Sequence, residues 1–162
     1  MKELAIFGST GSIGCSTLNV VRRHRDRFAV SILTAGRNLQ RLIEQIREFN
    51  PRHVYIIEEK DAAVLRELFP GLDIYRGEDG MDKVSRLTDF DIGVSALVGV
   101  AGLRPTWNMI NNGKTVALAN KEVLVAGGRL VMEAARKQGA ALLTVDSEHS
   151  AIMQCLRGEN HG

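Results

Sequence analysis

Short apolar segments alternate along this chain with longer segments that have helical periodicity. The short segments are rich in β-branched residues, and they are Leu4–Phe7, Phe28–Thr34, Val54–Ile57, Ile92–Leu97, Thr115–Leu118 and Ala141–Val145. The longer segments carry apolar residues along one side, and they are Ser12–Arg23, Leu39–Phe49, Asp61–Phe69, Gly80–Leu87, Arg104–Ile110 and Glu122–Lys137. Because neighbouring parallel strands must be joined by crossover connections, this order predicts an α/β fold. We expect a doubly wound, mainly parallel sheet with helices on both faces.

A glycine-rich turn follows the first predicted strand directly and leads into the first predicted helix. It has the sequence GSTGSIG over residues 8–14, with its glycines spaced three apart. Glycine permits a tight strand-to-helix turn and lets the backbone approach a pyrophosphate closely, while the helix N-terminus attracts the phosphate charge. The alternative is a glycine-rich turn without a ligand, but its place in a strand–helix–strand pattern favours dinucleotide binding.

The end of the second predicted strand indicates which dinucleotide is bound. An NAD site usually has an acidic residue about twenty positions after the glycine turn, where it binds the adenosine ribose. This sequence has Ala35-Gly36-Arg37-Asn38 there and no acid. An arginine can pair with a 2′-phosphate, so Arg37 favours NADP(H), although Arg37 on its own could equally be a surface residue.

Two carboxylates, Asp146 and Glu148, flank Ser147 directly after the last predicted strand. Residues two apart on an extended chain project to the same side, so both can face one site at the carboxyl end of the sheet, where such folds bind ligands. Carboxylates without a Cys or His cluster suit Mg²⁺ or Mn²⁺. Taken alone, the triplet is explained better by capping of the amphipathic segment Ser147–Leu156.

Asn120, Lys121 and Glu122 follow the Thr115–Leu118 segment in the equivalent position. Lys121 could bind a phosphorylated or carbonyl substrate, and the alternative is a solvated charged turn. Polar residues after three different strands, all at one edge of the predicted sheet, favour a shared site over the alternative.

The overall charge and the cysteine usage bear on partners and compartment. The 162 residues carry 21 basic and 19 acidic side chains, and the basic cluster at residues 22–25 has no interleaved aromatic residues, so we expect no nucleic-acid partner. The longest uncharged segment contains the glycine turn and several hydroxyl residues, so we expect no membrane association. Cys15 and Cys155 have no metal-binding or redox spacing, which fits a reducing cytoplasm.

Five blocks of this sequence resemble the 1-deoxy-D-xylulose 5-phosphate reductoisomerase family. They are GSTGSIG at residues 8–14, AGRN at 35–38, VGVAGLRP at 98–105, ALANKEV at 117–123 and VDSEHSAI at 145–152. They occur in the family's order and spacing and span nearly the whole chain. The glycine turn alone is common, whereas LANKE together with VDSEH is highly specific.

The resemblance implies an NADPH-dependent enzyme of non-mevalonate isoprenoid biosynthesis. Such an enzyme rearranges a sugar phosphate, 1-deoxy-D-xylulose 5-phosphate, and reduces it to 2-C-methyl-D-erythritol 4-phosphate with the help of Mg²⁺ or Mn²⁺. By position, the implied cofactor-binding residues are Thr10, Gly11, Ser12, Ile13, Gly36, Arg37, Asn38, Asn120 and Glu122. The implied substrate-binding residues are Lys121, Ser147 and Glu148, the metal ligands are Asp146 and Glu148, and the catalytic residues are Lys121, Asp146 and Glu148.

The resemblance also implies how the chain is divided. Residues 1–145 are expected to form a Rossmann-like NADPH-binding domain, and residues 146–162 to begin a catalytic domain whose remainder is absent. The full-length protein is expected to be a homodimer, whereas this fragment can be monomeric and is expected to be inactive alone. Two other functions stay open, namely another NADP-dependent dehydrogenase, such as one acting on an amino-acid semialdehyde, and a nucleotide-binding module without catalytic activity.

Overall fold

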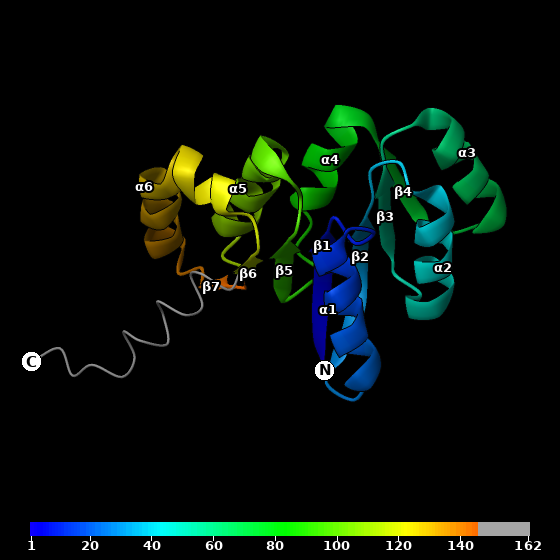
Figure 1. Ribbon diagram of the computed structural model, residues 1–162, viewed down its shortest axis with the longest axis horizontal. Coiled ribbons are helices and arrows are strands. Elements are labelled where there is room, and N and C mark those ends of the chain that lie inside the picture. Colours follow the sequence, from blue (N-terminus) through cyan, green and yellow to red (C-terminus); the bar gives the residue numbers. More distant parts are fainter. Residues whose placement is uncertain (146–162) are drawn as a thin grey trace, which may run out of the picture.

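The computed structural model describes residues 1–145, which form one parallel sheet with helices on both faces (Figure 1). The strands are β1 (Lys2–Phe7), β2 (Phe28–Thr34), β3 (His53–Ile56), β4 (Asp73–Arg76), β5 (Ile92–Ser95), β6 (Thr115–Leu118) and β7 (Leu142–Thr144). The helices are α1 (Ser12–Arg23), α2 (Leu39–Phe49), α3 (Glu59–Leu68), α4 (Gly77–Ser85), α5 (Leu103–Asn111) and α6 (Lys121–Gln138), with a 3-10 turn η1 (Gly99–Gly102) before α5. The predicted fold class is confirmed.

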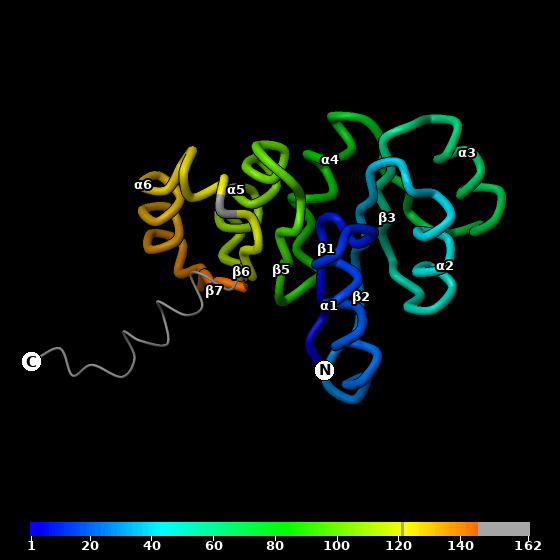
Figure 2. The backbone as a smooth tube through the Cα atoms, in the orientation of Figure 1, coloured from blue at the N-terminus to red at the C-terminus, as the bar shows by residue number. Residues whose placement is uncertain are grey.

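The direction of winding reverses at β1. The strand order is β4-β3-β2-β1-β5-β6-β7, so the chain first steps outward to β4 and α4 then returns it to the other side of β1 (Figure 2). Helices α1, α2 and α3 pack in the core on one face, and α4, α5 and α6 in the core on the other. β1 contributes to both cores because its side chains alternate, with Leu4 and Ile6 in the first and Ala5 and Phe7 in the second. The switch point, where doubly wound sheets bind ligands, therefore lies at the carboxyl ends of β1 and β5.

β2 contains one residue more than its pairing with β1 requires. Leu4 pairs with Val30 but Ala5 pairs with Ile32, so Ser31 forms a β-bulge. The bulge places Val30 and Ile32 in opposite cores, although a regular strand would put residues two apart on the same face. Ser31 itself is fully buried, and its hydroxyl forms hydrogen bonds in a charged cluster at the start of β3.

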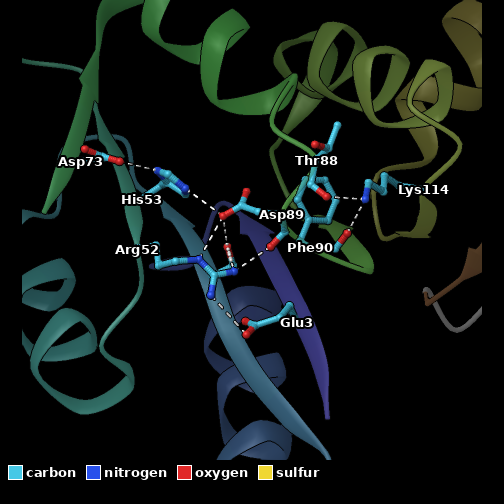
Figure 3. Close-up of polar contacts among 9 residues, drawn as sticks. Glu3, Arg52, His53, Asp73, Thr88, Asp89, Phe90 and Lys114 are labelled. Carbon is cyan, nitrogen blue, oxygen red and sulfur yellow. Dashed lines mark hydrogen bonds and ion pairs between the residues drawn. The ribbon is translucent and has the colours of Figure 1, made fainter.

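That charged cluster joins the amino-terminal ends of several strands, at the sheet edge opposite the glycine turn (Figure 3). Arg52 donates to Oδ2 of Asp89 at 3.0 Å, to the carbonyl oxygen of Asp89 at 2.8 Å and to Oε1 of Glu3 at 3.4 Å. His53 lies between two acids, with Nε2 2.9 Å from Oδ2 of Asp89 and Nδ1 3.2 Å from Oδ2 of Asp73. The starts of β1, β3 and β4 are thereby linked to the segment that enters β5.

One strand was not expected from the sequence. β4 is the outermost strand on one side of the sheet, and it is short and half-exposed. It begins and ends with charged residues, so it lacks the apolar run that marks the other strands. The other strands and the helices match the predicted segments to within a few residues at their ends. The predicted segment Ser147–Leu156 lies outside the described residues. Within residues 1–145, no helix is both long enough and apolar enough to cross a membrane.

The charged cluster gives folding a dependence on pH. Burial raises the pKa of the Asp89 carboxyl. The hydrogen bond from Arg52, together with His53 and Ser31, lowers this pKa by more than burial raises it, so the pKa lies below its ordinary value. A carboxylate whose pKa is lowered in this way stabilises the folded state at pH values above about 3.9, which is its pKa in the unfolded chain. The stabilisation is lost as the pH falls toward the lower pKa of the same carboxyl in the folded protein.

We therefore predict that Asp89→Asn lowers the free energy of unfolding near neutral pH, where the wild-type carboxylate is ionised. The same variant should lose less stability than the wild type between about pH 5 and about pH 3, because it has no carboxylate to protonate. Urea unfolding across this range measures both effects. Asp26→Asn is the matched control, since Asp26 is exposed. Parallel pH profiles for Asp89→Asn and the wild type would contradict the prediction.

Candidate nucleotide-binding site

The glycine turn connects β1 to α1, and the end of β2 holds it in place. The N–H of Gly8 donates to Thr34, at 3.2 Å from the carbonyl oxygen and 2.9 Å from the hydroxyl oxygen. The same carbonyl oxygen accepts the N–H of Ser9 at 2.8 Å. Gly8 has a φ of +93°, a conformation that side chains rarely allow. The turn is thus fixed to the neighbouring strand through its backbone.

The three glycines of the turn meet different steric requirements. A Cβ at Gly8 would lie 2.7 Å from the carbonyl oxygen of Ala96, which follows β5. A Cβ at Gly14 would lie 2.3 Å from the carbonyl oxygen of Gly8, because α1 packs directly on the turn. A Cβ at Gly11 would have one neighbour within 4 Å, the carbonyl oxygen of Gly8 at 3.4 Å. The fold therefore requires Gly8 and Gly14, whereas Gly11 leaves the outer side of the turn open.

Helix α1 begins without a side-chain cap and without an acidic residue in its first turn. Gly11 is the N-cap, and Ser12 and Ile13 are exposed residues whose N–H groups have no acceptor within residues 1–145. Free N–H groups and the positive end of the helix dipole attract an anion such as a phosphate. Thr10, Gly11, Ser12 and Ile13 thus lie together at one helix terminus, and their contact with a cofactor stays a prediction.

The segment after β2 lies beside this turn and begins α2. The side chain of Asn38 caps α2 by accepting the N–H of Arg41 at 3.1 Å, and α2 has no acidic residue in its first turn. Arg37 is exposed, and within the part of the chain that the structure describes it forms no ion pair. The carbonyl oxygen of Gly36 accepts the N–H of Ile57 at 3.4 Å. A second helix N-terminus, preceded in the chain by an unpaired cation, therefore borders the glycine turn.

Two side chains of α2, one helical turn apart, hold consecutive carbonyl groups of the glycine turn. Nε2 of the buried Gln45 donates to the carbonyl oxygen of Ser9 at 2.9 Å, and the Ser9 hydroxyl donates to Oε1 of Gln45 at 2.7 Å. Nη1 of Arg41 donates to the carbonyl oxygen of Thr10 at 3.2 Å. Neither Gln45 nor Arg41 was predicted as a site residue. Arg41 and Gln45 are four residues apart, so the sequence indicates that they lie on the same side of α2. It does not indicate that this side of α2 faces the glycine turn.

On the other side of the switch point, Asn120 joins the loop after β5 to α6. It is the N-cap of α6, and its Oδ1 accepts the N–H of Val123 at 3.3 Å. Its Nδ2 donates to the carbonyl oxygens of Leu97 and of Gly99, the latter at 2.7 Å. Asn120 is 3% exposed, so in this structure its side chain positions the loop. Its contact with a cofactor stays a prediction.

The remaining predicted residues follow β6 and β7, which are neighbours in the sheet. Lys121 is the first residue of α6, and Glu122 is exposed in its first turn. Asp146, Ser147 and Glu148 follow β7 in the sequence but lie outside the described residues, so the metal site stays a prediction. Among residues 1–145 there is no group of three or more His, Cys, Asp or Glu side chains that could hold a metal ion.

The contrast between glycines can be tested by matched substitutions. Gly14→Ala places a methyl group against backbone that cannot move without disrupting the turn, so we predict a loss of about 1–3 kcal/mol in the free energy of unfolding. A Cβ at Gly128 in α6 would have no neighbour within 4 Å, so Gly128→Ala should instead stabilise the protein by about 0.5–1 kcal/mol. Chemical denaturation distinguishes the two, and equal effects would show that the packing at Gly14 is not restrictive.

Comparison with known proteins places this arrangement in a family. A family model for 1-deoxy-D-xylulose 5-phosphate reductoisomerase matches residues 4–128. The protein of that name from Geotalea uraniireducens (strain Rf4) is 49% identical over 160 residues, which cover 98% of this chain and 42% of that protein. This chain therefore spans about two fifths of the length of the curated relatives it matches.

Solved structures agree with the sequence comparison. A crystal structure of DOX-P reductoisomerase in complex with NADPH, fosmidomycin and magnesium superposes with a TM-score of 0.90 at 37% identity, over 96% of this chain and 39% of that one. The Zymomonas mobilis reductoisomerase in complex with NADPH superposes with a TM-score of 0.89 at 38% identity, over 99% of this chain and 42% of that one. The chain belongs to the 1-deoxy-D-xylulose 5-phosphate reductoisomerase family.

Proposed function

We propose that this chain is the NADPH-binding part of an enzyme that converts 1-deoxy-D-xylulose 5-phosphate to 2-C-methyl-D-erythritol 4-phosphate in isoprenoid biosynthesis. The observation that carries the proposal is the glycine turn at the switch point, which leads into the uncapped N-terminus of α1, together with the unpaired Arg37 shortly after the neighbouring strand β2. Solved structures of relatives with a similar fold are complexes with NADPH, which supports the same cofactor here.

The described residues fit a dinucleotide with a 2′-phosphate. The N–H groups of Ser12 and Ile13 would bind the pyrophosphate, and Gly11 leaves room for its approach because a Cβ there would have a single neighbour. Arg37 would pair with the 2′-phosphate, where an acid would repel it. Asn38 would contribute through its position at the N-terminus of α2, and Gly36 through its backbone.

The other predicted residues would hold the substrate and a divalent ion. When bound, NADPH supplies the hydride and Mg²⁺ or Mn²⁺ supplies a Lewis acid. Asp146 and Glu148 would hold the ion through carboxylate oxygens, the donors that such ions prefer. Lys121 and Ser147 would bind the sugar phosphate, with Glu122 and Asn120 toward the nicotinamide.

The division of labour along the chain is part of the proposal. Residues 1–145 would form the NADPH-binding domain, and residues 146–162 would begin a catalytic domain. We propose a homodimer for the complete protein and a cytoplasmic location. The 162-residue chain alone would not turn over substrate, since the relatives it matches are more than twice as long.

The activity is tested on the complete protein by following NADPH absorbance with 1-deoxy-D-xylulose 5-phosphate and Mg²⁺. We expect oxidation of NADPH that stops when the ion is chelated, and a severe loss of turnover in Asp146→Asn and Glu148→Gln. A dehydrogenase acting on a semialdehyde would stay active after chelation. A binding module without catalysis would give no oxidation of NADPH in the wild type.

The cofactor preference is tested by reversing the charge at Arg37. Arg37→Asp should raise the Kd for NADPH by about 10–100-fold, because it replaces a charge-assisted hydrogen bond to phosphate by repulsion. The Kd for NADH should change little, since NADH has no 2′-phosphate. Fluorescence titration with both dinucleotides measures the ratio, and Arg47→Asp, at the far end of α2, is the control. A variant that still prefers NADPH as strongly as the wild type would exclude this role for Arg37.

A further inference from the structure

We infer that Arg41 is a second cation for the 2′-phosphate of the bound dinucleotide, and so determines NADP(H) selectivity together with Arg37. The inference rests on the proposed function and extends it to a residue that the sequence pattern did not assign. It follows from where the structure places the Arg41 guanidinium, from the charges around it and from its unused hydrogen-bond donors.

The position of Arg41 is fixed from two sides. Its backbone N–H is bound by the capping side chain of Asn38, and Nη1 of its guanidinium donates to the carbonyl oxygen of Thr10 at 3.2 Å. The guanidinium therefore bridges the glycine turn and the first turn of α2. Arg37 lies four residues earlier, just before the N-cap of the same helix. Both cations are thus placed at the carboxyl end of β2, where dinucleotide folds bind the adenosine ribose.

Arg41 forms no ion pair among residues 1–145, although Glu44 lies three residues further along α2. Most arginines of the described chain pair with carboxylates, as in the pairs formed by Arg22, Arg52 and Arg104. Arg37 and Arg41 form no such pair within residues 1–145, and neither α1 nor α2 has an acidic residue in its first turn. A cation is unfavourable beside the positive end of a helix dipole. An anion bound between the two helix ends would neutralise both arginines and both dipoles.

The guanidinium of Arg41 keeps donors available for such an anion. It has five N–H groups, and in the described structure Nη1 is the nitrogen in contact, with Thr10 and, at 3.9 Å, with Sγ of Cys15. Arg41 is exposed, so the other nitrogens can be reached from solvent. The planar arrangement of these donors matches two oxygens of one phosphate group, which a lysine cannot reproduce.

A purely structural role for Arg41 makes a different prediction. If Arg41 only held the Thr10 carbonyl, as Gln45 holds the Ser9 carbonyl, its loss would disturb the turn that binds the pyrophosphate. The pyrophosphate is common to NADPH and NADH, so both affinities would fall together. A cation for the 2′-phosphate affects NADPH alone. The ratio of the two affinities therefore separates the two roles.

The test uses the complete protein and its Arg41→Gln variant, titrated with NADPH, NADH, 2′,5′-ADP and 5′-AMP. We expect the Kd for NADPH and for 2′,5′-ADP to rise about tenfold, the size expected for loss of one solvent-accessible charge-assisted hydrogen bond. The Kd for NADH and for 5′-AMP should stay within about twofold, because neither ligand meets the lost cation. Arg41→Lys should retain part of the selectivity, since it keeps the charge and loses the planar fork.

Arg47→Gln is the matched control, since it removes the same charge from the last turn of α2. A parallel loss for NADPH and NADH, unchanged affinities in Arg41→Gln, or an equal effect of Arg47→Gln would each overturn the role of Arg41 while leaving the proposed function intact. Absence of NADPH binding by the wild-type protein would instead reject the proposed function, and this inference with it.

Discussion

Thr34 holds the glycine turn on the sheet, and the rest of the candidate site depends on this attachment. Its carbonyl oxygen accepts the N–H groups of Gly8 and Ser9, and its hydroxyl oxygen accepts the first of these as well. Gln45 and Arg41 then take the next two carbonyl groups of the turn. Because each peptide unit is planar and trans, carbonyl oxygens that point toward α2 leave the N–H groups of the same units pointing away from it. The N–H groups of these two units belong to Thr10 and Gly11, and the N–H of Gly11 donates to the carbonyl oxygen of Gly8 at 3.1 Å, which closes the turn directly before the unpaired N–H groups of Ser12 and Ile13.

Arginines at the two ends of the parallel strands have opposite environments. At the amino-terminal ends of the strands, Arg52 forms ion pairs with Glu3 and Asp89, so its charge is compensated within the protein (Figure 3). At the carboxyl edge, Arg37 and Arg41 have no acidic partner among the described residues and stand beside two helix N-termini. The first arrangement stabilises the fold, and the second is the one that we propose for the ligand phosphates. The second arrangement follows from a parallel sheet, which places every helix N-terminus that follows a strand at the carboxyl ends of the strands.

The alternation of apolar runs and helical periodicity was sufficient to predict the fold class, since each buried strand is a nearly continuous apolar segment. β4 escaped prediction because an exposed edge strand does not need such a segment. The residues of the glycine turn were predicted because their chemistry is local in sequence. Arg41 and Gln45 were not, because only the packing of α2 against the sheet decides which of its sides meets the turn. Asn120 was predicted as a cofactor contact, and the structure adds that its side chain caps α6 and holds the loop after β5.

The bulge at Ser31 has a consequence for the far end of its strand. Side chains along a strand alternate strictly between faces, so one extra residue reverses the phase of everything that follows it. From Ile32 onward, β2 is in the phase that brings Thr34 opposite Phe7 and within reach of Gly8. If the strand lacked this single extra residue, a residue next to Thr34 in the sequence would face the turn in place of Thr34. The bulge, three residues before Thr34, thus determines which residue of β2 binds the glycine turn. It does so through the number of residues in the strand and not through their chemistry.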